Sequence, residues 1–254
     1  MKGNKKNFKK KRDSRLLLTF TFMFICCAGL FYYNSFANKS ISNESISIKK
    51  SEFLSMVPNG FESIGIDISH HQGSIDWDRL FEVARFDTLI SFVYCKATEG
   101  ADHIDSRYSQ YRKELKKRGI PNGSYHFFSA TSDPIIQADH FLKYWDQKEM
   151  DLPPVLDVEV EFSDYSIMIR NIGAWLNRVE EQSGMRPIIY TSQHFYETKF
   201  SNEFKDYKFW IAAYSKRPEC IEDARIIHWQ FSEEGILPGI DEPVDLNVSK
   251  IRFL

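Results

Sequence analysis

The chain has 254 residues, a formal net charge of −2 at pH 7 and a sequence pI near 6.4. This balance provides no basic surface for nucleic acid, so nucleic acid is not an expected partner. Residues 59–254 have the length of one domain and are enough to bury a sizeable core.

The amino terminus carries the signals of export. Residues 1–15 are basic, and an apolar run follows from Leu16 to Tyr33. Positive charge ahead of an apolar segment keeps the amino terminus in the cytoplasm and sends the residues after it across the membrane. Residues 16–37 are therefore expected to be a transmembrane signal-anchor, or a signal peptide that is removed after Ala37. Residues 38–58, rich in Ser, Asn and Lys, predict a flexible linker.

Strands and helices alternate along residues 59–254. Strands are predicted at 63–69, 88–97, 123–128, 155–159, 186–191, 207–213, 225–231 and 244–247. Helices are predicted at 77–86, 106–118, 134–147 and 165–183, and Gly119 and Gly184 are expected to stop the second and the fourth.

This alternation favours one fold class, α/β. Apolar strands that alternate with helices imply parallel pairing with both faces covered, and about eight of them suggest a closed barrel. The domain is short for that fold, and the connection between Ala213 and Arg225 is too brief for a full helix. We therefore expect an irregular TIM-like (β/α) barrel with some helices short or missing.

The stretch from Pro153 to Val160 carries two carboxylates among apolar and β-branched residues. In a strand, Asp157 and Glu159 share a face with their Cα atoms roughly 6 to 7 Å apart. Like charges at that distance in a partly buried cleft push the two pKa values apart, so one group stays protonated while the other is ionised. This is the equipment of a glycosidase. The alternative is a strand whose polar face meets solvent, but the apolar flanks favour a buried site.

Polar and aromatic residues gather at the predicted strand ends. In a barrel of parallel strands these ends carry the chemistry. The residues are Asp67, Lys96, Glu99, Tyr125, His126, Asp157, Glu159, Tyr190, Trp210, Tyr214, Trp229, Gln230 and Asp245. Any one of them is more often structural than functional, but their joint placement on one rim predicts a site.

Six fragments of the domain, in order, resemble the glycoside hydrolase family 25 lysozymes, which are muramidases of the Chalaropsis type. The fragments are residues 65–73, 96–100, 123–128, 154–159, 228–231 and 239–247. Each alone is weak, whereas six in the right order are specific. The resemblance implies an irregular barrel that hydrolyses the β-1,4 bond between N-acetylmuramic acid and N-acetylglucosamine. It also implies peptidoglycan strands as the partner and the bacterial cell envelope as the location, with the domain outside the cytoplasm.

The resemblance implies roles for the four acids. Glu159 matches the general acid that protonates the leaving oxygen. Asp157 matches the partner carboxylate, which stabilises the oxocarbenium-like state or orients the substrate's acetamido group. Asp67 and Asp245 match two rim aspartates that hold and polarise this pair. Retention through the acetamido group is expected on the resemblance, because sequence spacing does not separate it from inversion.

Aromatic residues are expected to form the sugar-stacking walls of a groove, because sugars present apolar C–H faces to rings. The expected substrate-binding residues are Tyr125, Phe127, Tyr190, Trp210, Tyr214, Trp229, Gln230, Lys96 and Glu99. Barrel core is an equal alternative for Phe127 and Tyr190. Trp210 and Trp229 are expected at the floor or wall because they lie near strand ends.

Rival functions have weaker support. No metal or other cofactor is expected, since His70 and His71 stand in no metal-binding spacing. A serine or cysteine nucleophile is disfavoured, because no Gly-x-Ser-x-Gly elbow is present and Cys95 is expected to be buried in a strand. A chitinase would carry aspartates where Leu152 and Val155 stand. The last rival is a catalytically inactive, membrane-tethered glycan-binding module, which the presence of all four acids disfavours. A monomer is expected.

Overall fold

The computed structural model describes residues 60–82, 90–146, 152–162, 164–214 and 218–253. All of them belong to one compact unit, Pro58–Leu254. The predicted leader and linker, residues 1–58, lie outside the described residues, as do residues 83–89 of the predicted helix and strand there. Within the described part, no helix combines the length and the apolar character needed to cross a membrane.

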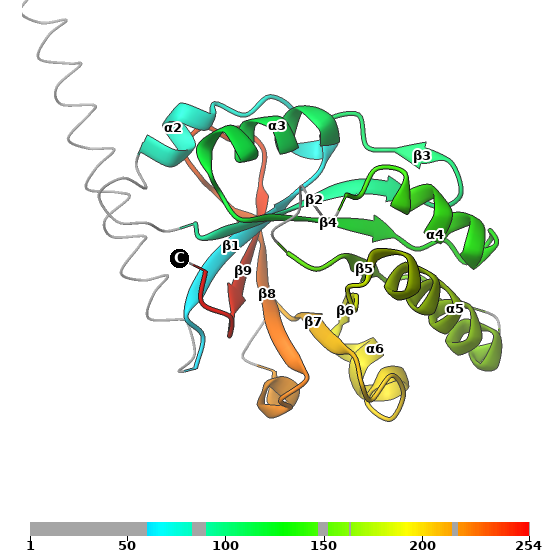
Figure 1. The fold of residues 1–254 in the computed structure, drawn as a ribbon. Coiled ribbons are helices and arrows are strands. Elements are labelled where there is room, and N and C mark those ends of the chain that lie inside the picture. The colour runs from blue at the N-terminus through cyan, green and yellow to red at the C-terminus, as the bar shows by residue number, and fades with distance from the viewer. Residues whose placement is uncertain (1–59, 83–89, 147–151, 163, 215–217, 254) are drawn as a thin grey trace, which may run out of the picture. The chain divides into compact units, whose positions relative to one another are not determined.

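Nine strands of the described residues form one sheet, and eight of them close into a barrel (Figure 1). They are β1 (Ser63–Ile68), β2 (Phe92–Glu99), β3 (His103–Ile104), β4 (Asn122–Phe127), β5 (Val155–Asp157), β6 (Ile188–Ser192), β7 (Lys208–Ala212), β8 (Ile226–Gly235) and β9 (Val244–Ser249). The order around the barrel is β1-β9-β8-β7-β6-β5-β4-β2, and pairing of β1 with β2 closes it. The predicted barrel is confirmed, and β3 adds an unpredicted hairpin on β2.

The last strand of the barrel departs from the predicted parallel pairing. β1, β2 and β4 to β8 pair in parallel with one another, whereas β9 pairs antiparallel with both β8 and β1. Residues 236–243 join β8 to β9 without a helix. A parallel partner needs a long crossover, so this short connection returns the chain as a hairpin instead. The parallel prediction was wrong for this strand.

Some connections carry only short helices, as expected of an irregular barrel. η1 (His70–Gln72), α2 (Trp77–Glu82), α3 (Tyr108–Arg118), α4 (Pro134–Leu142) and α5 (Tyr165–Ser183) follow the first four barrel strands. After β6 the described residues contain only α6 (Gln193–Phe195) and η3 (Tyr196–Phe200), and after β7 only η4 (Glu219–Glu222). Gly119 and Gly184 end α3 and α5 in the left-handed conformation, with φ of 65° and 70°.

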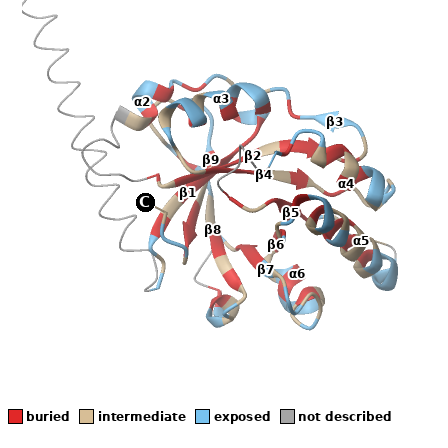
Figure 2. Cartoon of the chain, in the orientation of Figure 1, coloured by how far each residue is buried: buried red, intermediate tan, exposed pale blue. Residues whose placement is uncertain are grey.

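Side chains fill the barrel interior, and the strands are mostly buried (Figure 2). The central cluster contains Phe92, Tyr94, Leu152, Val155, Ile188, Tyr190, Trp210 and Ala212. Gly123 makes room for this packing, because a Cβ there would lie 2.3 Å from the Tyr94 ring. Cys95 is buried as predicted, and neither it nor Cys220 forms a disulfide.

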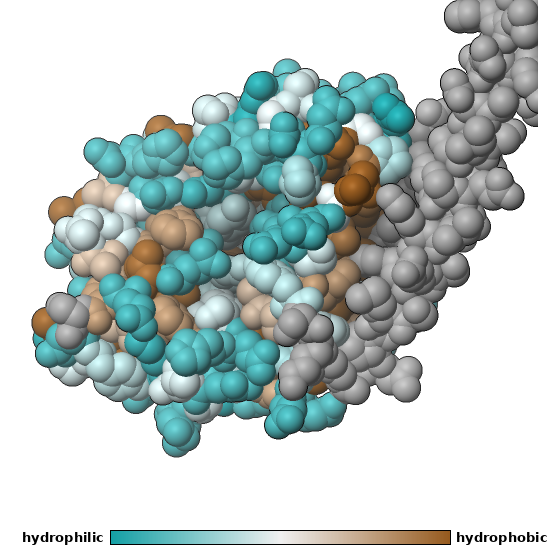
Figure 3. All heavy atoms as spheres, turned by 180° about the vertical axis from the view of Figure 1, so that it is seen from behind, coloured by the Kyte–Doolittle hydropathy of each residue, from teal (hydrophilic) through white to brown (hydrophobic). Residues whose placement is uncertain are grey.

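Polar side chains cover most of the face seen in Figure 3, where apolar side chains occur in separate groups. The apolar material is concentrated instead in the barrel and between the barrel and helices α3 to α5, where Leu115, Phe141 and Trp175 are fully buried. With its interior filled, the barrel offers space for a ligand only at its ends.

Candidate active site

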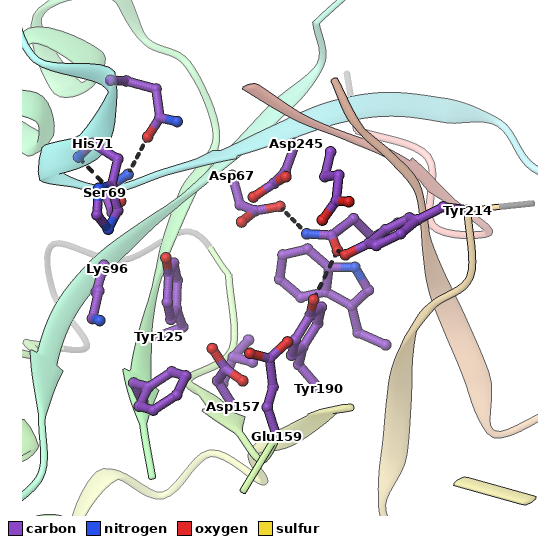
Figure 4. A pocket seen from close by; sticks show the side chains of 16 residues that line it. Asp67, Ser69, His71, Lys96, Tyr125, Asp157, Glu159, Tyr190, Tyr214 and Asp245 are labelled. Atoms are coloured by element: carbon purple, nitrogen blue, oxygen red, sulfur yellow. Dashed lines mark hydrogen bonds between the residues drawn. The ribbon is translucent and has the colours of Figure 1, made fainter. Parts of the chain in front are cut away.

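A pocket of about 270 Å³ opens at the carboxyl ends of the parallel barrel strands (Figure 4). It is lined by Asp67, Ser69, His71, Gln72, Lys96, Tyr125, Phe127, Val155, Asp157, Glu159, Tyr190, Trp210, Tyr214, Gln230, Glu233 and Asp245. All four predicted acids are in this set, together with seven of the nine predicted substrate-binding residues. The barrel therefore brings most of the predicted site residues into one cavity.

The end of β5 places Asp157 and Glu159 beside each other (Figure 4). β5 ends at Asp157, two residues earlier than predicted, but its neighbours hold the chain beyond it. The Val158 N–H donates to the Tyr190 carbonyl at 2.9 Å, and the Thr191 hydroxyl donates to the Val158 carbonyl at 2.8 Å. Asp157 is buried and Glu159 is exposed at the rim. The pair thus spans the pocket from its floor to its mouth.

Both carboxyl groups of this pair favour the protonated form. Burial raises the pKa of Asp157 well above its ordinary value, and repulsion from Glu159 and Asp67 adds to it. The pKa of Glu159 is also raised, first by desolvation in the pocket and then by the charge of Asp67, while the Tyr190 hydroxyl and Lys96 oppose the rise. Glu159 is solvent-accessible at the rim, but the pocket atoms around its carboxyl group still desolvate it. The pair therefore holds a proton to a higher pH than two isolated carboxyl groups would.

Asp157 has one further feature that bears on chemistry. Its Oδ1 atom is buried and has no hydrogen-bond partner among the described residues. A buried polar atom without a partner is unfavourable by about 1 to 3 kcal/mol. Since Asp157 lines the pocket, a donor from a bound molecule would satisfy this oxygen.

Asp67 and Asp245 form a second acidic pair. They are directly opposite each other in the antiparallel ladder of β1 and β9. Asp67 is buried, and its Oδ2 accepts hydrogen bonds from Gln230 Nε2 at 2.9 Å and Asn247 Nδ2 at 2.8 Å. Burial, and then repulsion by Asp67, raises the pKa of Asp245 to about 9. Burial also raises the pKa of Asp67 above its ordinary value, and the hydrogen bonds from Asn247, Gln230 and Asp245 oppose this rise.

Rings form part of the pocket wall, as predicted. Tyr125, Phe127, Tyr190, Trp210 and Tyr214 line it. Tyr214 is 46% exposed and offers a ring at the mouth, whereas Trp210 is only 2% exposed and lies at the bottom. The core alternative also holds for Tyr190, which belongs to the central barrel cluster as well.

Lys96 is the lysine of the pocket wall, and its surroundings fix its ammonium group. Its Nζ lies 2.6 Å from Glu99 Oε2 and 4.8 Å from the centre of the Phe127 ring. The hydrogen bond from Lys96 lowers the pKa of Glu99. Glu99 itself does not line the pocket. The structure places this predicted substrate-binding residue behind Lys96, where it holds the cation.

Trp229 is the other predicted residue that lies elsewhere. It is buried, its indole N–H donates to the Ala213 carbonyl at 2.9 Å, and its ring lies 6.2 Å from that of Phe61. Successive strand residues point to opposite faces, so Gln230 enters the pocket and Trp229 does not. Trp229, predicted at the floor or wall, therefore does not line this pocket.

Four polar pocket residues were not predicted: Ser69, His71, Gln72 and Glu233. The first three come from the turn after β1, where the Gln72 side chain accepts a hydrogen bond from the Ser69 N–H at 2.8 Å and donates to the Pro243 carbonyl at 2.9 Å. A polar turn directly after a strand end was the available signal. Glu233 reaches the rim because β8 continues to Gly235 through irregular pairing with β9.

A second hollow of about 610 Å³ adjoins the first pocket. The two share Glu159, Tyr214 and Glu233, and the second is completed by Ser192, Gln193, His194, Glu197, Ala212 and Ala213. Glu159 therefore stands between two concave surfaces. Among the described residues, no group of three or more His, Cys, Asp or Glu side chains is arranged to hold a metal ion.

Comparisons with known proteins identify the family. The model of the glycosyl hydrolases family 25 matches residues 66–240. YegX of Escherichia coli K12, an uncharacterized protein, is 34% identical over 197 residues, which are 77% of this chain and 72% of YegX. The autolytic lysozyme of Clostridium acetobutylicum is 32% identical over 187 residues, which are 72% of this chain and 54% of that lysozyme.

The fold agrees with this assignment. A family 25 glycosyl hydrolase from Bacillus anthracis superimposes with a TM-score of 0.69 at 26% identity, covering 77% of this chain and 92% of the other. The resemblance seen in the six sequence fragments is thereby confirmed. The chain belongs to the glycosyl hydrolases family 25.

Proposed function

We propose that the domain is a lysozyme that cleaves the β-1,4 bond between N-acetylmuramic acid and N-acetylglucosamine in peptidoglycan. The observation that carries this proposal is the Asp157–Glu159 pair in a pocket lined by ring side chains, with Glu159 at the junction of two hollows. Glu159 is the general acid, and Asp157 is the carboxylate that assists the substrate's acetamido group. Membership of the glycosyl hydrolases family 25 and the 32% identity with the autolytic lysozyme of C. acetobutylicum support the choice of substrate.

Substrate binding assigns the proton within the pair. Before substrate enters, burial favours the proton on Asp157, the deeper of the two. An acetamido N–H that donates to the unpartnered Oδ1 of Asp157 favours the ionised form of that carboxyl group. The two groups titrate as a unit, so the proton then resides on Glu159, next to the glycosidic oxygen.

The reaction then follows from these positions. Glu159 gives its proton to the bridging oxygen as the C1–O bond breaks, and the acetamido carbonyl oxygen forms a bond to C1. Asp157 stabilises the positive charge of the resulting oxazolinium ion through its N–H. In the second step the Glu159 carboxylate takes a proton from water, whose oxygen attacks C1 and opens the ring. Two displacements at C1 retain its configuration.

The test measures new reducing ends released from peptidoglycan by the purified full chain, with muramic acid at the reducing terminus. Glu159→Gln keeps the side-chain shape and removes the proton, so activity should fall by about 10²- to 10⁴-fold while the fold is kept. Glu161→Gln is the matched control, because Glu161 is an exposed neighbour that pairs with Lys199 at 3.0 Å and does not line the pocket. Wild-type activity in Glu159→Gln would reject the acid assignment. Glycan binding without any cleavage by the wild type would indicate a binding module instead.

The same proposal includes a location. A lysozyme reaches peptidoglycan only outside the cytoplasm, and the basic residues 1–15 followed by the apolar run support export. We place the domain in the bacterial cell envelope, tethered through residues 16–37, or secreted if the chain is cut after Ala37.

A further inference from the structure

The buried Asp67 carboxylate is held by an amide whose orientation is fixed from behind. Asn247 Nδ2 donates to Asp67 Oδ2 at 2.8 Å, and the indole N–H of Trp210 donates to Asn247 Oδ1 at 2.9 Å. An indole N–H can only donate, so it admits the amide in one orientation, with its NH₂ group toward Asp67. Asn247 is fully buried and Trp210 is 2% exposed, so water does not compete for these contacts.

A second amide is held in the same way from the other side. Gln230 Nε2 donates to the same Asp67 oxygen at 2.9 Å. The hydroxyl groups of Tyr190 and Tyr214 both donate to Gln230 Oε1 at 2.7 Å. Asp67 Oδ2 therefore receives two oriented N–H donors, and each favours the charged form of the carboxylate.

The partner across the ladder, Asp245, shares a side-chain hydrogen bond with Asp67, but no side-chain amide of the described residues donates to its carboxyl group. Asp245 is the direct cross-strand neighbour of Asp67, where two like charges are unfavourable. The pair can lower this repulsion by keeping one proton, and the side with fewer donors is the side that keeps it. We propose that Asn247, oriented by Trp210, is a positioning residue that fixes the negative charge of the Asp67–Asp245 pair on Asp67 and leaves the proton on Asp245.

This charge assignment has a consequence for catalysis, which rests on the proposed lysozyme function. An anionic Asp67 raises the pKa of both Asp157 and Glu159 and so helps the pocket hold the proton that the reaction needs. The other ionisable groups of the pocket wall, besides the tyrosines, are Lys96 from β2, Glu233 from β8 and His71 from η1. Tyr125, Tyr190 and Tyr214 also face the pair, and burial raises the pKa of each.

The pair can be observed directly, without any activity. The full chain is labelled with ¹³C at the aspartate carboxyl carbons, kept in detergent and titrated by NMR. Asp67→Asn and Asp245→Asn identify the two signals by their loss. In the wild type we expect Asp67 ionised and Asp245 protonated at pH 7. Asp245 ionised at pH 7, or Asp67 protonated, would overturn the proposal.

Two variants test the role of Asn247. Asn247→Leu removes one donor to an anion, so the pKa of Asp67 should rise by about one to two units, while that of Asp245 falls. Trp210→Phe removes only the orienting N–H and should give a smaller change in the same direction, which covers the case that Asn247→Leu does not fold.

Trp229→Phe is the matched control, because this equally buried indole donates to the Ala213 carbonyl outside the pocket. Its carboxyl titrations should match the wild type. Unchanged titrations in Asn247→Leu or Trp210→Phe, or a shift in the control as large as theirs, would overturn the proposal.

Kinetics then separate the two proposals. If the protein is a lysozyme, Asn247→Leu should move the alkaline limb of the pH–rate profile to lower pH, because a weaker charge on Asp67 releases the Glu159 proton earlier. The effect belongs to kcat rather than KM, since Asn247 does not line the pocket. An inactive wild type with the expected carboxyl titrations would reject the lysozyme and keep the charge assignment. An active enzyme whose alkaline limb is unmoved by Asn247→Leu would reject the charge assignment.

Discussion

At the scale of single residues, Asp245 shows what an acidic pocket does to stability. Its pKa is raised to about 9, so between pH 4 and pH 9 the folded protein holds a proton that the unfolded chain releases. The stability due to this proton is complete below the unfolded pKa and is lost as pH rises through the folded one. Asp245→Asn cannot ionise, so it should unfold at a higher temperature than the wild type at pH 8 and at a similar temperature at pH 4. Equal midpoints at pH 8 would contradict this.

His228 gives the stability of the fold a pH dependence of the opposite sign. Its ring is buried between Phe92 and Trp210, both ring nitrogens lack partners among the described residues, and burial lowers its pKa to about 3. Its contribution to stability is therefore complete above the unfolded pKa near 6.5 and is lost as pH falls toward 3. His228→Leu has a similar volume without polar atoms. It should raise the free energy of unfolding by about 1 to 3 kcal/mol at pH 7, and by more at pH 5.

Urea unfolding at the two pH values checks this prediction. His140→Leu is the matched control, because His140 is also buried but its Nε2 contacts the His103 carbonyl at 3.0 Å. That variant loses a hydrogen bond and should be less stable than the wild type. If both leucine variants lost stability equally at pH 7, the unpartnered nitrogens would not be the cause in His228.

At the scale of elements, two glycines with opposite surroundings test the packing of the barrel. A Cβ at Gly123 in β4 would lie 2.3 Å from the Tyr94 ring, whereas one at Gly173 in α5 would meet Phe204 at an ordinary 3.8 Å. Gly123→Ala must displace a ring in a filled interior, so it should destabilise the fold by about 1 to 3 kcal/mol or more. Gly173→Ala should stabilise α5 by about 0.5 to 1 kcal/mol. Chemical unfolding measures both changes in stability. An unchanged stability in Gly123→Ala would show that the barrel interior can rearrange to accept the methyl group.

The elements also show which structural features can be predicted from the sequence and which cannot. Helix stops at Gly119 and Gly184 were predictable, because a left-handed residue ends a helix locally. The orientation of Trp229 was not predictable, because an aromatic residue fits either face of a strand. Only the strand pairing fixes which face meets the pocket. Glu233 was missed for a related reason. The pairing of β8 with β9 shifts register beyond Gln230, and no local sequence pattern predicts such a shift.

At the scale of the whole molecule, barrel closure joins the two ends of the domain. Asp67 and Asn247 are 180 positions apart and share a hydrogen bond because β9 inserts between β8 and β1. The order of the sequence fragments predicted that both segments belong to one rim. It could not predict which carboxyl group carries the proton, since that depends on donors such as Trp210 and Gln230, which come from other strands.

The proposed location depends on residues 1–58, which are open to a direct test. The apolar run at 16–33 is near the lower length limit for a membrane-spanning helix, and eight Lys and Arg residues precede it. We expect the full chain, expressed in a bacterium, to sediment with membranes and to be released by detergent but not by high salt. A chain that begins at residue 38, expressed without export, is the control and should stay in the supernatant. Amino-terminal sequencing distinguishes a retained anchor, which begins at Met1 or Lys2, from a chain cut after Ala37, which begins at Asn38. An uncut chain free of membranes would contradict both forms of the prediction.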